Sequence, residues 1–380
     1  MEPLEARDLF ALAGHCIFLN HAGTSPLSAR SRAAVEQVSQ ALAEKPYPEG
    51  WWREEADRLR ESAAHLIGGS AEQVSITRST AHGISLLAGG LDWKEGDNVV
   101  GARGEYPANV YPWMALRERG VEFRMAEPAQ GRVLPESVLE LVDGRTRVVA
   151  LSHVEFWNGF RVDLASIGEE CRRRGVVFCV DAMQSCGALA LDLETMPVDF
   201  LATGAAKWLL GPQGIGFCYT APDLLERVRP VVVGVGSVKR FQQYFEYDLD
   251  FQANGRRFEE SSLSLLDMAA LNASIELLLE VGTAVVEERV LDLSARLAEG
   301  LAERGYQIVE PWPRERAESS GIVSFRKPGA GPQEVMRDLN AAQVVGRIHQ
   351  DFVRLSPHFW NTEEEVDRVL EVLTPQRVGG

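Results

Sequence analysis

A chain of 380 residues, of which 45% are hydrophobic and 25% charged, has the composition of a globular protein that can form a large domain with a smaller one attached. Its formal net charge of −16 argues against binding to nucleic acids or anionic membranes, because both require basic surface patches. No run approaches the roughly 18 apolar residues of a membrane span, and the N-terminal residues lack the pattern of a signal peptide, so we expect a cytoplasmic protein with neither a membrane nor a nucleic-acid partner.

The first part of the chain predicts helices around one short apolar run. Residues 1–19 are interpreted as a short helix followed by an apolar run, which ends in a turn that starts at Asn20. Residues 28–67 have a helical pattern. The two prolines within residues 45–50 must interrupt it, because proline cannot lie inside a helix.

From residue 73 onward, short apolar runs alternate with helical patterns. The repetition of strand, loop and helix predicts a mostly parallel sheet with helices on both faces. The expected strands are 74–76, 97–102, 121–125, 147–154 and 176–180, and the expected helices end near residues 88, 119 and 174.

Two charged residues follow neighbouring strands of this predicted sheet. The apolar run 176–180 ends in Asp181, and a second run, 198–202, leads to Lys207 and then to a glycine-rich segment. Because the carboxyl ends of parallel strands meet at one edge of a sheet, we expect the two side chains to face one crevice. A carboxylate and an amine there suit a Schiff-base cofactor, in which the amine holds an aldehyde and the acid tunes a heterocycle.

Each of these motifs also has a purely structural interpretation. The turn at Ser79 and Thr80 opens a helix whose unpaired N–H groups would bind phosphate, but either hydroxyl would also serve as a simple helix cap. Asp181 would cap the following helix as readily as it would hold a proton on a ring, and an isolated lysine is usually a surface group. Lys207 differs in lying among small and apolar residues, where desolvation lowers the pKa of the amine.

Later in the chain the pattern becomes irregular. The aromatic and acidic segment 241–258 is interpreted either as an arm across a subunit boundary or as an ordinary surface loop. A helix over 265–280 leads to a second region with its own helices and strands. This region ends in a strand at 352–356 and a helix that Thr362 and Glu365 open as a capping box.

The order of these motifs resembles the class V aminotransferase family of pyridoxal phosphate enzymes, which includes cysteine desulfurases, kynureninases and isopenicillin-epimerase-like proteins. The resemblance extends from Phe18-Leu19-Asn20 to the segment RLSPHFWNT at 354–362. It implies an α/β protein of fold type I, with a seven-stranded, mostly parallel sheet in a large domain of residues 18–260 and a smaller α+β domain made of residues 1–17 and 261–380. It also implies pyridoxal 5′-phosphate as cofactor, a small amino acid as substrate and a homodimer.

The resemblance assigns roles to individual residues. Lys207 would form the Schiff base with the cofactor, Asp181 would pair with the pyridine nitrogen, and Gln184 would approach the ring oxygen. Tyr106 matches the aromatic or histidine that stacks on the cofactor ring. Arg354 matches the arginine that binds the substrate carboxylate, a role that suits its planar pair of donors.

Further matches concern the cofactor phosphate and the ring oxygen. The turn Ser79, Thr80 and Ala81 matches the phosphate-binding turn of the family. Ser262 falls where relatives place a hydroxyl that reaches the phosphate of the partner subunit, which requires a homodimer. Asn158 falls near the ring oxygen in some relatives.

Two departures from the family pattern limit what the resemblance implies. Ala206 occupies the position before the lysine, where the family usually has histidine or another polar residue. Cysteine desulfurases carry a nucleophilic cysteine on a loop just before the arginine, and residues 340–354 contain none. Persulfide formation by that route is therefore not expected. The five cysteines form no CxxC pair, and no metal site is expected.

The expected activity is a reaction at the α-carbon of an amino acid, with Lys207 as the base. Transamination is placed first by analogy with the family, and a C–S β-lyase acting on a cysteine-type substrate or an amino-acid epimerase is the alternative. The non-enzyme alternative is a catalytically silent homologue, which would bind the cofactor or have a regulatory role. The presence of Lys207, Asp181, Gln184 and Arg354 together argues against this alternative, because a binding protein would not need all four. A nucleotide-binding dehydrogenase would need a GxGxxG turn after the first strand, which is missing.

Overall fold

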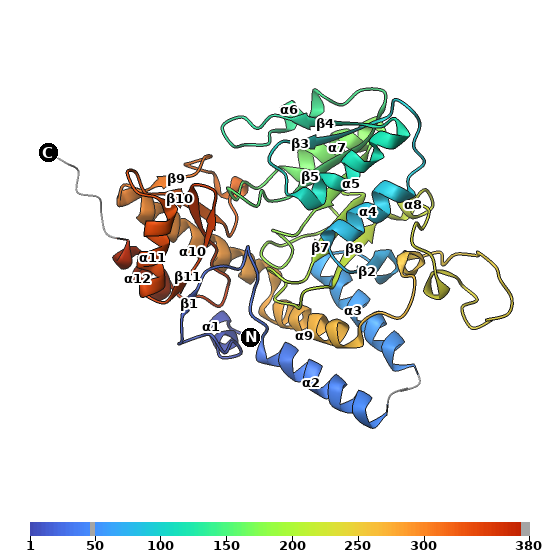
Figure 1. The fold of residues 1–380 in the computed structure, drawn as a ribbon, viewed down its shortest axis with the longest axis horizontal. Helices are drawn as coiled ribbons and strands as arrows, with labels where there is room; N and C mark the ends of the chain where they lie inside the picture. The colour runs from blue at the N-terminus through green and yellow to red at the C-terminus, as the bar shows by residue number, and fades with distance from the viewer. Residues whose placement is uncertain (46–49, 374–380) are drawn as a thin grey trace.

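The computed structural model describes residues 1–45 and 50–373 of the chain. Figure 1 shows a large lobe built on a central sheet, and a smaller lobe that contains the C-terminal part of the chain. The predicted interruption at 45–50 falls mostly outside the described residues. Separate helices lie on either side of it, α2 (Ala29–Glu44) and α3 (Trp51–Ile67).

The large lobe is organised around a seven-stranded sheet. Its strands are β2 (Val74–Thr77), β3 (Asn98–Ala102), β4 (Glu122–Ala126), β5 (Thr146–Ser152), β6 (Val177–Asp181), β7 (Phe200–Gly204) and β8 (Gly216–Thr220). They follow the order β2-β8-β7-β6-β5-β3-β4. Neighbouring strands from β4 to β7 are parallel, whereas β8 is antiparallel to both β7 and β2. The prediction of a mostly parallel sheet is confirmed.

Helices cover both faces of this sheet, as the alternating pattern predicts. Adjacent residues of β6 point to opposite faces. Cys179 packs in a cluster with α4 (Thr80–Gly90), whereas Phe178 and Val180 pack in a larger cluster with α3 and α9 (Leu265–Val281). The other helices of this lobe are α5 (Tyr111–Met114), α6 (Pro135–Leu139), α7 (Leu164–Arg174) and α8 (Pro222–Leu225).

The smaller lobe contains an antiparallel sheet with helices against it. The strands are β9 (Gln307–Ile308), β10 (Val323–Arg326), β12 (Arg347–His349) and β13 (Phe352–Leu355), and the helices are α10 (Thr283–Glu303), α11 (Pro332–Ala341) and α12 (Glu363–Val372). The strand order is β12-β13-β10-β9. Leu297, Leu339 and Val369 of the three helices join one apolar core with Val353 of β13. Thr362 caps α12, as predicted.

The N-terminal residues link the two lobes. After α1 (Pro3–Arg7), strand β1 (Ile17–Phe18) pairs in parallel with β11 (Val344–Val345) of the smaller lobe. The chain then crosses to the large lobe, where the amide of Ser25 donates to the carbonyl of Ala206 at 2.8 Å. The domain limits of 18–260 and 261–380 remain a prediction, and α9 packs with the large lobe.

The segment between α8 and α9 extends from the large lobe as a long irregular loop (Figure 1). Its aromatic side chains are unusually exposed: Phe245 is 91% and Tyr247 94% accessible. Within the described ranges, no single helix is long and apolar enough to cross a bilayer, and α9 with α10 meets that test only as a pair bent by 83°.

Candidate active site

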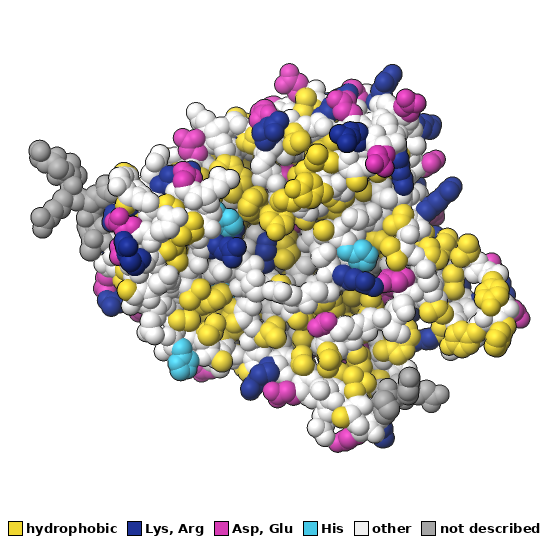
Figure 2. Space-filling model, in the orientation of Figure 1, with side chains coloured by type: hydrophobic (Ala, Val, Ile, Leu, Met, Phe, Trp, Pro, Cys, Tyr) yellow, Lys and Arg dark blue, Asp and Glu magenta, His cyan; other side chains and the backbone are white. Residues whose placement is uncertain are grey.

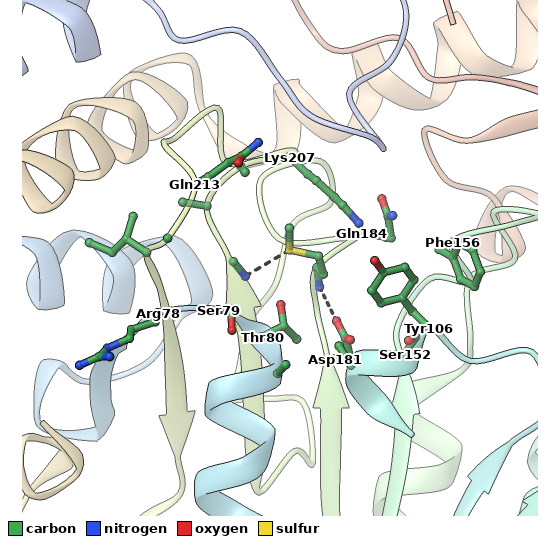
Figure 3. Close-up of a pocket in the computed structure, with 18 of the residues that line it drawn as sticks. Arg78, Ser79, Thr80, Tyr106, Ser152, Phe156, Asp181, Gln184, Lys207 and Gln213 are labelled. Carbon is green, nitrogen blue, oxygen red and sulfur yellow. Dashed lines mark hydrogen bonds between the residues drawn. The ribbon is translucent and has the colours of Figure 1, made fainter. Parts of the chain in front are cut away.

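A cavity of about 260 Å³ opens at the carboxyl ends of β6 and β7. In Figure 3, Lys207, Tyr106 and Asp181 point toward the same space, above the N-terminus of α4. The carboxyl ends of the parallel strands lie at this edge of the sheet, and ligand-binding crevices of such sheets form there. The residues predicted from the sequence that line it are Ser79, Thr80, Ala81, Tyr106, Asp181, Gln184 and Lys207.

Asp181 supplies a buried carboxylate at the floor of the cavity. It is the last residue of β6, a strand in which every position is buried, and it is 4% exposed. One carboxylate oxygen accepts a hydrogen bond from the amide of Met183 at 2.8 Å. Burial raises the pKa of Asp181 to about 6, while this hydrogen bond and the charge of Lys207 act in the opposite direction. The carboxylate is therefore poised to gain from a cationic partner in the cavity.

Lys207 brings an amine over the cavity without a fixed partner. Within the described part of the chain its Nζ makes no hydrogen bond or ion pair, and it lies 5.3 Å from the centroid of the Tyr106 ring. Burial lowers the pKa of Lys207 to about 8, with a further contribution from the positive charge of Arg354. A fraction of the amine is therefore neutral, and hence nucleophilic, near neutral pH. Ala206 adds only a methyl group beside it.

Tyr106 forms a side wall of the cavity. It precedes a short 3₁₀ turn, Pro107–Asn109, and packs edge-to-face on Phe156 with 5.2 Å between ring centroids. The tyrosine is 47% exposed, so one side of its ring is open. A flat heterocycle placed under Lys207 would find this aromatic surface free for stacking.

The N-terminus of α4 offers hydrogen-bond donors to the same cavity. Ser79 caps the helix by accepting from the amide of His82 at 3.1 Å, so the structural interpretation of this serine is correct. The amides of Thr80 and Ala81 precede the first intrahelical bond and have no partner there. Together with the positive end of the helix dipole, they suit an anionic group such as a phosphate.

Gln184 lines the cavity, but its amide is partly engaged. Its Nε2 donates to the carbonyl of Ala22 at 3.2 Å, and its Oε1 accepts from Nε1 of Trp208 at 2.8 Å. One N–H remains for a ligand. Trp208, directly after the lysine, thus fixes the orientation of the glutamine, a link that no local sequence signal indicates.

Arg354 approaches from the smaller lobe. It lies on β13, is 2% exposed and does not line the cavity itself, but its charge lowers the pKa of Lys207. Its Nη1 donates to the carbonyl of Phe156 at 2.6 Å, while Nε has no hydrogen-bond partner among the described residues. A buried guanidinium with free donors is what a carboxylate ligand needs.

The structure does not bring Asn158 to the cavity. Its Nδ2 donates to the carbonyls of Gly131 and Glu310 at 2.8 and 3.0 Å, and its Oδ1 accepts from the amide of Phe160 at 3.0 Å. The side chain is fully buried and holds loops of the two lobes together. This placement gives no support to the predicted contact with a ring oxygen.

Ser262 also lies apart from the cavity. It lines a second hollow, of about 280 Å³, together with Trp52, Arg256 and Tyr244. It is not among the residues that line the cavity at the N-terminus of α4, and its predicted contact with the phosphate of a partner subunit stays a prediction.

Sequence reasoning missed a group of buried carboxyls behind Asp181. Glu105 accepts from the amide and the hydroxyl of Ser152 at 2.6 and 2.5 Å, and burial raises its pKa to about 7. Neither oxygen of Glu155 has a hydrogen-bond partner among the described residues. Burial, followed by the charge of Glu105, raises the pKa of Glu155 well above its usual value. The protonated form of Glu155 is therefore favoured relative to that of an exposed glutamate.

Comparisons with known proteins agree with this geometry. The sequence family described as aminotransferase class-V matches residues 17–369. A probable cysteine desulfurase from Methanothermobacter thermautotrophicus is 29% identical over 83% of this chain and 82% of its own length. Isopenicillin N epimerase from Streptomyces clavuligerus is 29% identical over 97% of each chain.

Solved structures share the fold over nearly the whole chain. A cysteine desulfurase from Thermococcus onnurineus NA1 has a TM-score of 0.88 at 23% identity, covering 98% of this chain and 97% of that one. The cystine C-S lyase C-DES, in complex with its product cysteine persulfide, has a TM-score of 0.87 at 25% identity, covering 95% and 98%. The predicted large sheet with flanking helices and a smaller C-terminal domain is the fold of these enzymes.

Proposed function

Because the chain belongs to the class V aminotransferase family of pyridoxal phosphate enzymes, we propose that it transforms a small amino acid at the α-carbon, with transamination as the favoured outcome. The observation that carries this proposal is the position of Lys207. Its amine has no partner within the described residues, has a lowered pKa, and faces the same cavity as the buried carboxylate of Asp181.

The cavity fits pyridoxal 5′-phosphate, the cofactor of this family. A side chain on Gly204 would place its Cβ 3.1 Å from Sδ of Met183 and 3.6 Å from Oγ1 of Thr80, so the glycine keeps this space open. The free amides of Thr80 and Ala81 would hold the phosphate, Tyr106 would stack on the ring, and Asp181 would meet the ring nitrogen. When bound, the cofactor supplies an aldehyde that takes up the amino group and a ring that accepts electrons from the α-carbon.

Lys207 has two tasks in this scheme. It would hold the aldehyde of the cofactor before the substrate arrives, and its amine would then remove the proton from the α-carbon. A pKa of about 8 suits both tasks, because the amine gives and takes a proton near neutral pH. The apolar wall around it keeps water away from this proton transfer.

Asp181 and Arg354 orient the two ends of the reacting system. Asp181 would hold a proton on the ring nitrogen, because a buried carboxylate is stabilised by a neighbouring cation. Arg354 binds the carboxylate of the substrate through its free donors. A carboxylate held there places the α-carbon on the side of the cavity that Lys207 reaches.

A C–S β-lyase is the second candidate, and the likeness to the cystine C-S lyase C-DES favours it. A desulfurase reaction through a cysteine before Arg354 is not supported, because residues 340–354 contain no cysteine. An epimerase is the third candidate, on the strength of the similarity to isopenicillin N epimerase. All three reactions begin with removal of the α-proton and differ in where the electrons go next.

Borohydride treatment of the purified holoenzyme tests the core of the proposal. Peptide mass spectrometry should find the reduced cofactor on Lys207, with the peptide of the exposed Lys94 unmodified as an internal control. Incubation with a panel of amino acids, scored for keto acid, sulfide and α-deuterium exchange, then distinguishes the three reactions. A holoenzyme without cofactor on Lys207 after reduction would contradict the proposal, and release of pyruvate and ammonia from cysteine conjugates would favour the lyase.

We further propose a homodimer that uses the irregular loop between α8 and α9. This loop exposes an apolar set that a monomer would leave in water, and Ser262 lies near its C-terminal end. The exposed residues are Val231, Val232, Val233, Val235, Tyr244, Phe245, Tyr247 and Leu249. Light scattering on wild type and on a variant carrying Phe245→Ser and Tyr247→Ser should show a dimer and a weakened dimer. A monomeric wild type would contradict this proposal.

A further inference from the structure

Two arginines lie side by side on one face of the small-lobe sheet. In the antiparallel pairing of β12 with β13, Arg347 is directly opposite Arg354 and His349 is opposite Phe352. Because side chains alternate along a strand, these four residues share one face, while Val353 lies on the other and packs in the core. Directly opposed side chains on one sheet face are nearest neighbours.

This pair of like charges is not compensated by the protein. Like charges directly opposite each other destabilise a sheet, so such a pair normally has acidic neighbours. Neither Arg347 nor Arg354 forms an ion pair within the described ranges, and Arg354 contacts only a backbone carbonyl. By contrast, Arg326 on the adjacent strand β10 pairs with Asp351 at 2.7 Å. The uncompensated charge is therefore a local feature of the Arg347–Arg354 pair.

The positive charge is directed at the active site. Burial and then the charge of Arg347 lower the pKa of Arg354 to about 10, and Arg354 in turn lowers the pKa of Lys207. His349 is close to the same three cations, and with burial as the main cause its pKa falls to about 4. Figure 2 shows dark blue and cyan side chains together at the junction of the two lobes. The mouth of the site is therefore positive in a chain whose net charge is −16.

His349 adds a neutral donor to the two arginines. Its Nε2 is buried and has no hydrogen-bond partner among the described residues. The ring is held between Phe352, with ring centroids 6.0 Å apart, and Phe156, with centroids 6.1 Å apart. An anionic ligand at Arg347 would give this nitrogen a partner as well.

We propose that the substrate is an amino acid with a second acidic group on its side chain, whose α-carboxylate binds Arg354 and whose distal acid binds Arg347 and His349. This inference rests on the proposed function. One carboxylate can neutralise one guanidinium, and the α-carboxylate uses Arg354. The guanidinium of Arg347, which is exposed and without an ion pair in the described ranges, and the unpaired imidazole nitrogen of His349 then offer a second site for an anion. A substrate with an apolar side chain would leave two cations facing each other.

Equilibrium binding of inert dicarboxylates tests this directly, without turnover. Calorimetry on the holoenzyme at constant ionic strength should compare succinate, glutarate and adipate with butyrate. At least one dicarboxylate should bind about tenfold to a hundredfold more tightly than butyrate, as an additional charge-assisted pair implies. Arg347→Gln should remove this difference, whereas Arg337→Gln, which changes an exposed arginine on α11 of the same lobe, should preserve it. Equal affinities of all four acids for the wild type would overturn the proposal.

Kinetics provide the second measurement. For each amino acid that the enzyme turns over, the acidic form and its amide should be compared, glutamate with glutamine and aspartate with asparagine. The acidic member should have the lower KM, and Arg347→Gln should reduce the ratio of the two KM values by about tenfold or more. Preference for the amides, with cofactor still fixed on Lys207 by borohydride, would refute the substrate class and leave the proposed function intact. Absence of cofactor on Lys207 would refute the proposed function instead.

Discussion

The two lobes contribute opposite electrostatics to one cavity. The large lobe supplies three buried carboxyls, Asp181, Glu105 and Glu155, and burial raises the pKa of each. The small lobe supplies the guanidinium groups of Arg347 and Arg354, and Arg354 remains charged although burial lowers its pKa to about 10. The difference teaches that burial moves the pKa of a carboxyl toward neutral pH but leaves an arginine charged, so the small lobe keeps its side of the cavity positive.

The largest effect should come from Lys207→Ala, which removes the one lysine among the described residues that line the cavity. Abstraction of the α-proton should slow by about 10⁴-fold, because both the covalent attachment point and the base are lost. Exchange of α-deuterium followed by NMR measures this step without assuming the product. A variant that still exchanges at more than a tenth of the wild-type rate would assign the base to another residue.

Asp181→Asn should have the next largest effect, because it removes the one large-lobe carboxyl that faces the cavity with a titratable charge near pH 6. The ring nitrogen would lose its proton, and kcat should fall by about 10²–10³-fold with little change in the amount of bound cofactor. Steady-state rates and cofactor absorbance measure the two quantities. An unchanged kcat would show that the buried carboxylate is structural.

Glu105→Gln should change stability rather than chemistry. The folded-state pKa of Glu105, about 7, is above that of an unfolded glutamate, so the folded state binds its proton more tightly. Its contribution is complete below about pH 4.5 and is lost as the pH rises to about 7, which would lower the free energy of unfolding by up to about 3 kcal/mol. The variant should lack this loss. Urea unfolding at pH 5 and pH 7.5 compares the two proteins, and equal pH dependence would contradict the prediction.

The smallest effect should be the change that Arg347→Gln causes in the pKa of His349, which is sensitive to the cations of the small lobe. Its pKa is lowered to about 4 by burial and then by Arg354 and Arg347, so the ring should be neutral at pH 6. In Arg347→Gln the midpoint of its titration should rise by less than about one pH unit, because one of several causes is removed. Histidine NMR of the two proteins measures it, with the exposed His15 as the control. A midpoint that does not move would place Arg347 farther from the imidazole than the strand pairing implies.

The site residues that lie just after the ends of strands could be predicted from the sequence. Asp181 and Lys207 each follow a buried apolar run, and the rule that parallel strands end at one edge brings them together. The turn at Ser79 was predictable for the same reason, since it opens the helix after β2. Tyr106 needed the resemblance to a family, because its segment has no distinctive local pattern.

The remainder depends on contacts that are distant in sequence. Asn158 is at a plausible position, but Gly131 and Glu310 use its amide, and neither partner is evident from the local sequence. Glu105 and Glu155 gain their raised pKa values only when they are buried together. The opposition of Arg347 to Arg354 depends on the register of β12 with β13, which a two-residue connection fixes.

The pairing of β1 with β11 has a consequence for biosynthesis. On the ribosome, Ile17 emerges long before its partner Val344. The strand that connects both lobes must therefore wait, unpaired, while the large lobe assembles around it. Because Arg354 follows later still, the small-lobe side of the active site is synthesised after the large-lobe side that carries Asp181 and Lys207.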